Sequence, residues 1–123
     1  RTQMSVQAKY QEVLDLGQTF QATDGKVEEA NGVLKVWGTV KTQGQKDALW
    51  DKIKAIGGQA PSDIQADIKV SGESLSHEVV SGDTLGKIAK TYLGSSSKYK
   101  EIAEFNDISN PDLIKVGQVI RIP

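Results

Sequence analysis

Cysteine and histidine, the residue types that supply thiolate and imidazole groups to catalytic and metal sites, are scarce in this 123-residue chain. Cysteine is absent and His77 is the one histidine, which disfavours a thiolate or paired-imidazole metal site. His77 stands beside Glu78, a pair that would suit proton transfer, but no nucleophile follows at a recognisable spacing. We therefore expect His77 to have a structural role at the edge of a strand.

The acidic residues do not form an evident catalytic pair either. Glu28-Glu29 is expected at a solvated hairpin, and Asp47 and Asp51 are expected on a solvated helix face. A glycosidase needs two carboxylates held across a substrate cleft, and a module of this size rarely forms one. An enzyme is therefore the least favoured class.

Two polar turns are better candidates for a binding site. Ser81-Gly82-Asp83-Thr84 lies between a predicted strand and a predicted helix, where Asp83 would cap the helix by accepting hydrogen bonds from its free N–H groups. Asn110-Pro111-Asp112 forms a second turn before the last strand. The two tryptophans, Trp37 and Trp50, could form a sugar-stacking platform, but partly buried packing is the more common role of such residues.

Composition and charge limit the class of protein. With 37% hydrophobic and 25% charged residues, the chain resembles a globular protein. Residues 1–71 carry nine basic and nine acidic side chains, and residues 72–123 carry six and seven, so no basic face suits nucleic acid. No apolar run approaches the about 20 residues of a membrane helix. The chain begins at Arg1, from which we expect that an upstream segment was removed.

The elements that position these turns follow from hydrophobic periodicity. In the first 71 residues the spacing predicts a helix over 4–16 ended by Gly17, a hairpin of 26–30 and 33–40 around Asn31-Gly32, a helix over 44–56, and an alternating strand through 64–70. A three-stranded sheet with two helices on one face would bury all of these apolar stripes.

A polar stretch, residues 71–76, is the predicted linker to a second pattern. There we expect a strand at 77–80, a helix over 83–92, a helix over 98–106 with Tyr99, Ile102 and Phe105 inward, and a strand at 118–122. The predicted fold class is α+β, with an α-β-β-α-β domain at 1–71, a linker at 72–76 and a β-α-α-β domain at 77–123.

The second pattern carries the motifs of a known family. Four separate segments together resemble a complete LysM domain. They are Val79-Val80-Ser81-Gly82-Asp83-Thr84-Leu85-Gly86-Lys87-Ile88-Ala89, then Asn106, then Asn110-Pro111-Asp112-Leu113-Ile114, then Gly117-Gln118-Val119-Ile120-Arg121-Ile122-Pro123. One departure is Val116, where such modules often carry proline, so we expect a slightly looser turn.

The first 71 residues resemble a BON domain, with residues 32–40 as the matching hairpin strand. A BON domain followed by a LysM domain in one short chain resembles a bacterial group that includes a small cytoplasmic potassium-binding protein.

The LysM resemblance implies a shallow groove between the two turns that holds N-acetylated sugars. Main-chain groups would pair with the acetamido N–H and C=O, and an apolar notch would take its methyl group. The resemblance assigns eight residues to the two walls: Gly82, Asp83, Thr84 and Leu85 on one, and Pro111, Asp112, Leu113 and Ile114 on the other. Leu85 and Ile114 could equally belong to the core.

The resulting prediction is a non-catalytic protein that binds N-acetylglucosamine-containing glycan, with peptidoglycan or chito-oligosaccharide as partner. The alternative is a potassium-sensing protein whose two domains associate on ion binding, with no other cofactor expected. Potassium prefers neutral oxygens, and Gly25, Gly57-Gly58 and Gly72 are permissive positions, but the ion ligands stay unassigned. A third reading is an interaction protein with a vestigial groove.

We further expect a monomer, no nucleic-acid partner, and a second contact of the BON-like domain with membrane, protein or ion. The sequence leaves both the bacterial cell envelope and the cytoplasm open as compartments.

Overall fold

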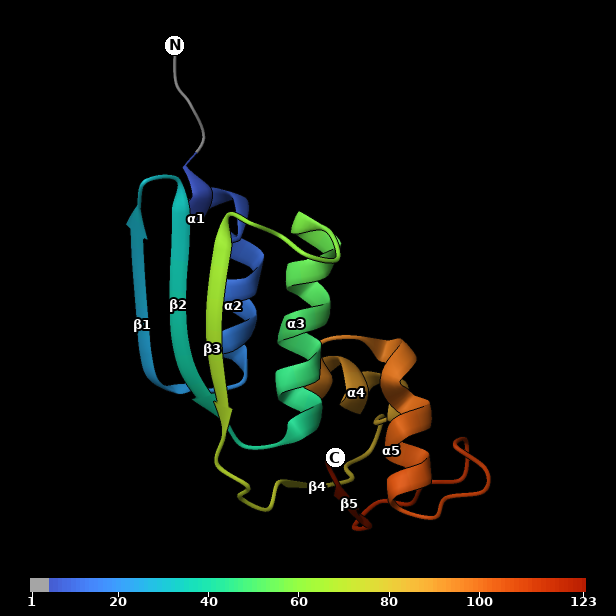
Figure 1. The fold of residues 1–123 in the computed structure, drawn as a ribbon. Helices are drawn as coiled ribbons and strands as arrows, with labels where there is room; N and C mark the ends of the chain where they lie inside the picture. Colours follow the sequence, from blue (N-terminus) through green and yellow to red (C-terminus); the bar gives the residue numbers. More distant parts are fainter. Residues whose placement is uncertain (1–4) are drawn as a thin grey trace.

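The computed structural model describes residues 5–123 and confirms a mixed α+β fold (Figure 1). Two separate sheets are present, one of three strands and one of two. Each sheet has its own cluster of buried side chains, which defines an N-terminal unit (residues 5–70) and a C-terminal unit (residues 75–123). The exact domain boundaries proposed above stay a prediction.

The first helical segment differs from the expectation. It consists of α1 (Val6–Lys9) and α2 (Gln11–Thr19), separated at Tyr10, while Met4 lies outside the described residues. The Tyr10 ring is fully buried and its hydroxyl donates to Asp63 at 2.6 Å, so a tertiary anchor overrides the continuous helical pattern. Gly17 does not end the helix, because α2 packs against α3 and this contact outweighs the low helix propensity of glycine.

The N-terminal sheet has the order β1-β2-β3. β1 (Thr23–Ala30) and β2 (Val33–Val40) form the expected antiparallel hairpin, and both turn residues have positive φ, 56° at Asn31 and 76° at Gly32. β3 (Ile64–Val70) pairs with β2 in parallel, and α3 (Gln43–Gly57) makes the crossover between them.

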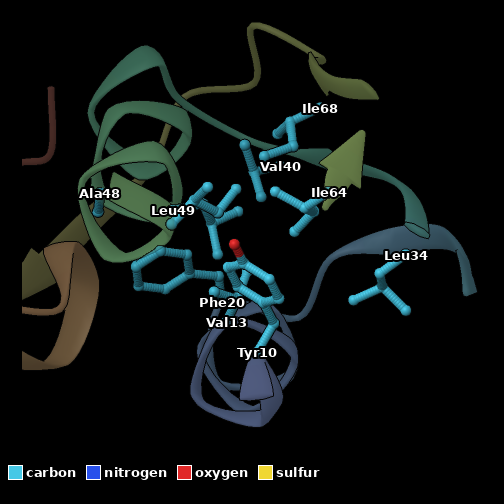
Figure 2. Close-up of a cluster of buried hydrophobic side chains, with 10 residues drawn as sticks. Tyr10, Val13, Phe20, Leu34, Val40, Ala48, Leu49, Ile64 and Ile68 are labelled. Atoms are coloured by element: carbon cyan, nitrogen blue, oxygen red, sulfur yellow. The ribbon is translucent and has the colours of Figure 1, made fainter. Parts of the chain in front are cut away.

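The N-terminal core lies between this sheet and the two longer helices. Figure 2 shows the apolar side chains of α2, α3 and the strands converging on Tyr10 and Phe20. The apolar stripes of these elements face the core. Leu34, Val40, Leu49, Ile53, Ile64 and Ile68 are buried, and Val36, Ile56, Ala66 and Val70 pack against them partly buried. Trp50 packs against this core, as predicted, whereas Trp37 does not belong to it.

The C-terminal unit has the element order expected of two short strands and two helices. β4 (Ser76–Glu78) pairs antiparallel with β5 (Val119–Arg121), and α4 (Leu85–Leu93) and α5 (Tyr99–Phe105) are joined by the 3-10 turn η1 (Ser96–Lys98). The prediction that Phe105 points inward is wrong. Its ring is 46% exposed, with the Arg121 guanidinium 5.2 Å from the ring centroid.

The two units contact each other through the start of α3. Gln45 is 2% exposed, and its Nε2 donates to the Tyr92 carbonyl at 3.3 Å. Gly44 lies so close to Pro123 and Leu93 that a β-carbon would overlap the Pro123 carbonyl oxygen. Lys98 Nζ bonds the Asp51 carboxylate at 2.8 Å across the same junction.

Within residues 5–123, none of the helices has the length and apolarity that crossing a bilayer requires. The same described range contains no group of three or more His, Cys, Asp or Glu side chains arranged to hold a metal ion.

Candidate functional site

The first candidate loop is a tight turn between β4 and α4. The Asp83 N–H donates to the Val80 carbonyl at 3.1 Å, and Gly82 adopts a φ of 91°, a conformation that favours glycine. Lys87 Nζ donates to the Gly82 carbonyl at 3.1 Å. The turn is therefore held by its own backbone and by the first turn of α4.

The prediction that Asp83 caps α4 is wrong. The N-cap is Thr84, whose hydroxyl accepts from the Lys87 N–H at 3.1 Å. Asp83 Oδ2 instead accepts from the Val80 N–H at 2.9 Å and from His77 Nε2 at 2.7 Å. The hydrogen bond from His77, followed by that from Val80, holds the pKa of the Asp83 carboxyl below its usual range.

His77 joins this loop to the end of α4. Because the Asp83 carboxylate only accepts, His77 Nε2 donates to it, and in the neutral ring Nδ1 accepts from the Tyr92 hydroxyl at 2.9 Å. Both ring nitrogens are thus engaged within the unit, in agreement with the predicted structural role. The partner is Asp83 rather than the adjacent Glu78, since successive residues of a strand point to opposite faces.

The second candidate loop, residues 110–114, is closed by two hydrogen bonds. The Asp112 N–H donates to the Asn110 side chain at 3.0 Å, and the Leu113 N–H donates to the Asn110 carbonyl at 3.0 Å. Leu113 is 69% exposed, whereas Ile114 is partly buried against the C-terminal core. An apolar side chain is therefore presented to solvent beside this turn.

The two loops leave the same end of the β4–β5 ribbon. The Val79 N–H donates to the Gln118 carbonyl at 2.9 Å, and the Gly117 N–H donates to the Val79 carbonyl at 2.8 Å. These bonds continue the strand pairing up to the point where both loops begin. Backbone hydrogen bonds therefore hold together the residues that precede the first loop and those that follow the second.

The eight assigned residues divide by exposure. Leu85 is 1% exposed and belongs to the core, so it packs beneath the first loop and is not available to contact a ligand. The others are exposed or partly buried: Gly82, Asp83, Thr84, Pro111, Asp112, Leu113 and Ile114. Five hollows of about 220 to 550 Å³ lie elsewhere on the described surface.

Asn106 has a role that the sequence did not indicate. Its side-chain amide donates to the Arg121 carbonyl at 2.7 Å and accepts from the Arg121 N–H at 2.8 Å. The amide thus pairs with the edge of β5 as another strand would. Its place in the LysM-like pattern marked Asn106 as notable, but only the fold places it against a strand 15 residues away.

Comparison with known proteins identifies the class. The model of the LysM domain family matches residues 77–123, which is the segment that carries both loops. The secreted LysM effector slp2 of Pyricularia oryzae is 48% identical over 58 residues, covering 47% of this chain and 19% of the effector. The N-acetylmuramoyl-L-alanine amidase XlyB of Bacillus subtilis is 34% identical over 79 residues, 63% of this chain and 24% of the amidase. The protein is therefore a LysM-domain protein.

A third relative covers nearly the whole chain. The potassium binding protein Kbp of Escherichia coli is 33% identical over 118 residues, which is 94% of this chain and 79% of Kbp. The chain belongs to the same family as Kbp. By contrast, it spans only about a fifth of the LysM effector and a quarter of the amidase.

LysM domains are non-catalytic binding modules that imply recognition of N-acetylglucosamine-containing glycans such as peptidoglycan or chitin. They also occur in enzymes, as the similarity to the amidase shows.

Proposed function

We propose that this protein is a non-catalytic binding protein that recognises N-acetylglucosamine-containing glycan, with peptidoglycan as its principal partner. The binding site is the surface between residues 82–85 and 110–114. The observation that carries the proposal is the LysM match over residues 77–123, which includes both loops and the strands that join their bases.

The chemistry of the two loops suits an acetamido sugar. Gly82 and Thr84 are exposed residues whose N–H groups can donate to the acetamido C=O, while their carbonyls already accept from Lys87 and from the Ile88 N–H. Leu113 offers an apolar contact for the methyl group. The Asp83 carboxylate is already used by His77 and Val80, so Asp83 shapes the loop rather than reaching for the ligand. A single shallow site buries little ligand surface, so we expect weak binding.

A titration with chito- and muro-oligosaccharides, followed by amide chemical shifts of the full chain, tests the proposal. Shifts at residues 82–85 and 110–114 are expected. Replacing Leu113 by Ser should weaken binding by about tenfold, since burial of an apolar side chain contributes roughly 1.5 kcal/mol. Val119→Ser is the matched control, because Val119 is also exposed, at 60%, but lies outside the loops. Unchanged amide chemical shifts at both loops would count against the glycan site.

Potassium is the second candidate ligand, and the whole-chain similarity to Kbp favours it. In this proposal the two units associate more tightly when the ion is bound. Carbonyl oxygens of glycine-rich turns would supply the cage, and Gly58 and Gly72 both adopt positive φ, at 91° and 79°. Exchanging sodium for potassium at constant ionic strength should raise the melting temperature and compact the chain in scattering. Identical melting curves and scattering in both salts would reject this candidate.

The BON-like character of residues 1–71 stays a prediction, as does their second contact with membrane, protein or ion. We also retain a monomer as the expected state of the protein.

A further inference from the structure

One face of the N-terminal sheet has no helix packed on it. In β2, Leu34, Val36 and Val40 point into the core, so Lys35, Trp37 and Thr39 point to the opposite face. Figure 1 shows α2 and α3 on the same side of the sheet, which leaves the side that carries Trp37 uncovered. We call this uncovered side the outer sheet face.

Trp37 is the central side chain of the outer sheet face. The register places it between Lys26 of β1 and Asp67 of β3, and places Thr39 next to Lys69. Trp37 is half-buried but packs against neither core. A large aromatic ring on an otherwise polar sheet surface offers an apolar face to a ligand, whereas Trp50 packs against the core.

A hollow of about 440 Å³ opens beside the ring. It is lined by Trp37, Gly38 and Thr39, by the acidic residues Asp24 and Asp67, and by the basic residues Lys26 and Lys69. This volume lies within the range of small-molecule sites. Two carboxylates and two ammonium groups cancel, so neither an anion nor a cation gains from the net charge.

The geometry points to a carbohydrate-binding platform on the outer sheet face, in which a neutral sugar ring stacks on Trp37. The apolar face of a pyranose suits the indole face, and its hydroxyl groups suit the surrounding carboxylates, ammonium groups and Thr39 hydroxyl. This platform is separate from the LysM loops and does not depend on the function proposed for them.

Lys26 lies over the ring at present, with Nζ 5.3 Å from the Trp37 ring centroid. Its other partner is Glu28, at 3.0 Å, and both side chains are more than half exposed. Such a surface pair contributes little to stability, so the lysine stem can move aside at small cost. Its ammonium group then stays near the ring edge, where it can donate to a sugar hydroxyl.

The test uses the full chain with two neutral tetrasaccharides, chitotetraose and cellotetraose. In a Trp50→Phe background Trp37 is the one remaining tryptophan, so its emission reports directly on the platform. We expect a saturable change in Trp37 emission and amide shifts at Gly38, Asp67 and Lys69. If Trp50→Phe perturbs folding, the amide chemical shifts of the unsubstituted chain test the same platform.

Three substitutions on the same face refine the test. Trp37→Val keeps a β-branched residue in the strand and should weaken binding at the platform by about fivefold or more. Asp67→Asn, a change on an exposed side chain, should also weaken binding. Lys35→Ala is the matched control, because Lys35 shares the strand and the face but not the hollow, and it should leave binding unchanged.

The outcomes separate this inference from the LysM proposal. Shifts confined to residues 82–85 and 110–114, with Trp37 unmoved by both sugars, would overturn the platform and leave the LysM site standing. Shifts confined to the outer sheet face would support the platform and count against the LysM site. Displacement of the sugar by a single-stranded oligonucleotide, with tighter binding of the latter, would also overturn it.

Discussion

At the scale of single residues, hydrogen bonds between distant positions decide the local structure. Tyr10 interrupts a helix because its hydroxyl reaches Asp63, and Asp83 leaves the cap of α4 to Thr84 because it bonds His77. The Asn106 side-chain amide forms the two hydrogen bonds with the Arg121 backbone that a neighbouring strand would otherwise form at the edge of β5. In each case a side-chain hydrogen bond replaces the local role that the sequence pattern suggests.

The Tyr10–Asp63 bond gives a prediction on stability and pH. Tyr10→Phe should destabilise the fold by about 1.5 kcal/mol, since it removes the hydroxyl that donates to the Asp63 carboxylate. Burial, with the nearby Asp63, raises the pKa of Tyr10 to about 12. The unfolded chain therefore loses this proton first, and stability falls as pH rises from 10 towards 12. Tyr10→Phe should flatten that slope in urea unfolding measured across this range.

Tyr99→Phe is the control for that experiment, because Tyr99 packs against the C-terminal core and the change leaves the Tyr10–Asp63 hydrogen bond intact. An unchanged alkaline slope in Tyr10→Phe would contradict the assignment.

The turn at residues 115–118 supports a second prediction. The Gln118 N–H donates to the Lys115 carbonyl at 3.0 Å, and Gly117 has a φ of 88°, which together describe a type II turn with Val116 at its second position. Proline suits that position, so Val116→Pro should stabilise the fold by roughly 0.5 kcal/mol through the unfolded state. Thermal unfolding measures the gain, and a lower melting temperature would show that the turn is of another type.

At the scale of elements, close approach rather than propensity fixes how helices meet their neighbours. The start of α3 lies against the end of the chain because Gly44 has no side chain. Gly17 in α2, by contrast, has no neighbouring atom within 4 Å of the position where a β-carbon would stand. Close neighbours therefore require a glycine at position 44, whereas no neighbouring atom requires one at position 17.

This contrast gives a matched pair of substitutions. Gly44→Ala should destabilise the fold by about 2 kcal/mol, since the new methyl group meets the Pro123 backbone and Leu93. Gly17→Ala should stabilise it by about 1 kcal/mol through helix propensity alone. Urea unfolding of both variants checks the signs, and equal effects would show that α3 does not approach the chain end so closely.

At the scale of the whole molecule, two small cores support each other. Each unit alone is near the size at which burial barely exceeds conformational entropy, so the junction contributes to the stability of both. Gln45 is central to the junction, because its side chain accepts from the Lys41 N–H at 3.2 Å while donating to the Tyr92 carbonyl. Tyr92 in turn bonds His77, and this chain of contacts extends to the first candidate loop.

Gln45→Ala tests this coupling. The change leaves two partly buried polar groups, the Lys41 N–H and the Tyr92 carbonyl, without this partner and should cost about 1 kcal/mol. It should also separate the unfolding midpoints of amide signals from the two units, which we expect to coincide in the unsubstituted chain. Gln43→Ala is the control, since Gln43 is exposed and bonds only Asp47 of its own helix. Coincident midpoints in Gln45→Ala would show that this contact does not couple the units.

The periodic elements and the LysM class were predictable from the sequence alone. The hairpin at Asn31-Gly32, the order of helices and strands in the first unit and the order of the C-terminal unit follow from apolar spacing and turn residues, because both signals are local in the sequence. The parallel pairing of β2 with β3 was not predicted. The family match confirms the motifs of residues 77–123.

Only the tertiary structure decided where the polar and aromatic side chains go. The exposure of Phe105, the His77–Asp83–Tyr92 hydrogen bonds and the junction at Gly44 and Gln45 have no signature in spacing. Their partners lie far apart in sequence, and a hydrogen bond or a close contact depends on distances that only the packed chain sets. The physical reason is that periodicity indicates which face of a helix or strand is apolar. It does not indicate which other element packs against that face, or which side chains contact the opposite one.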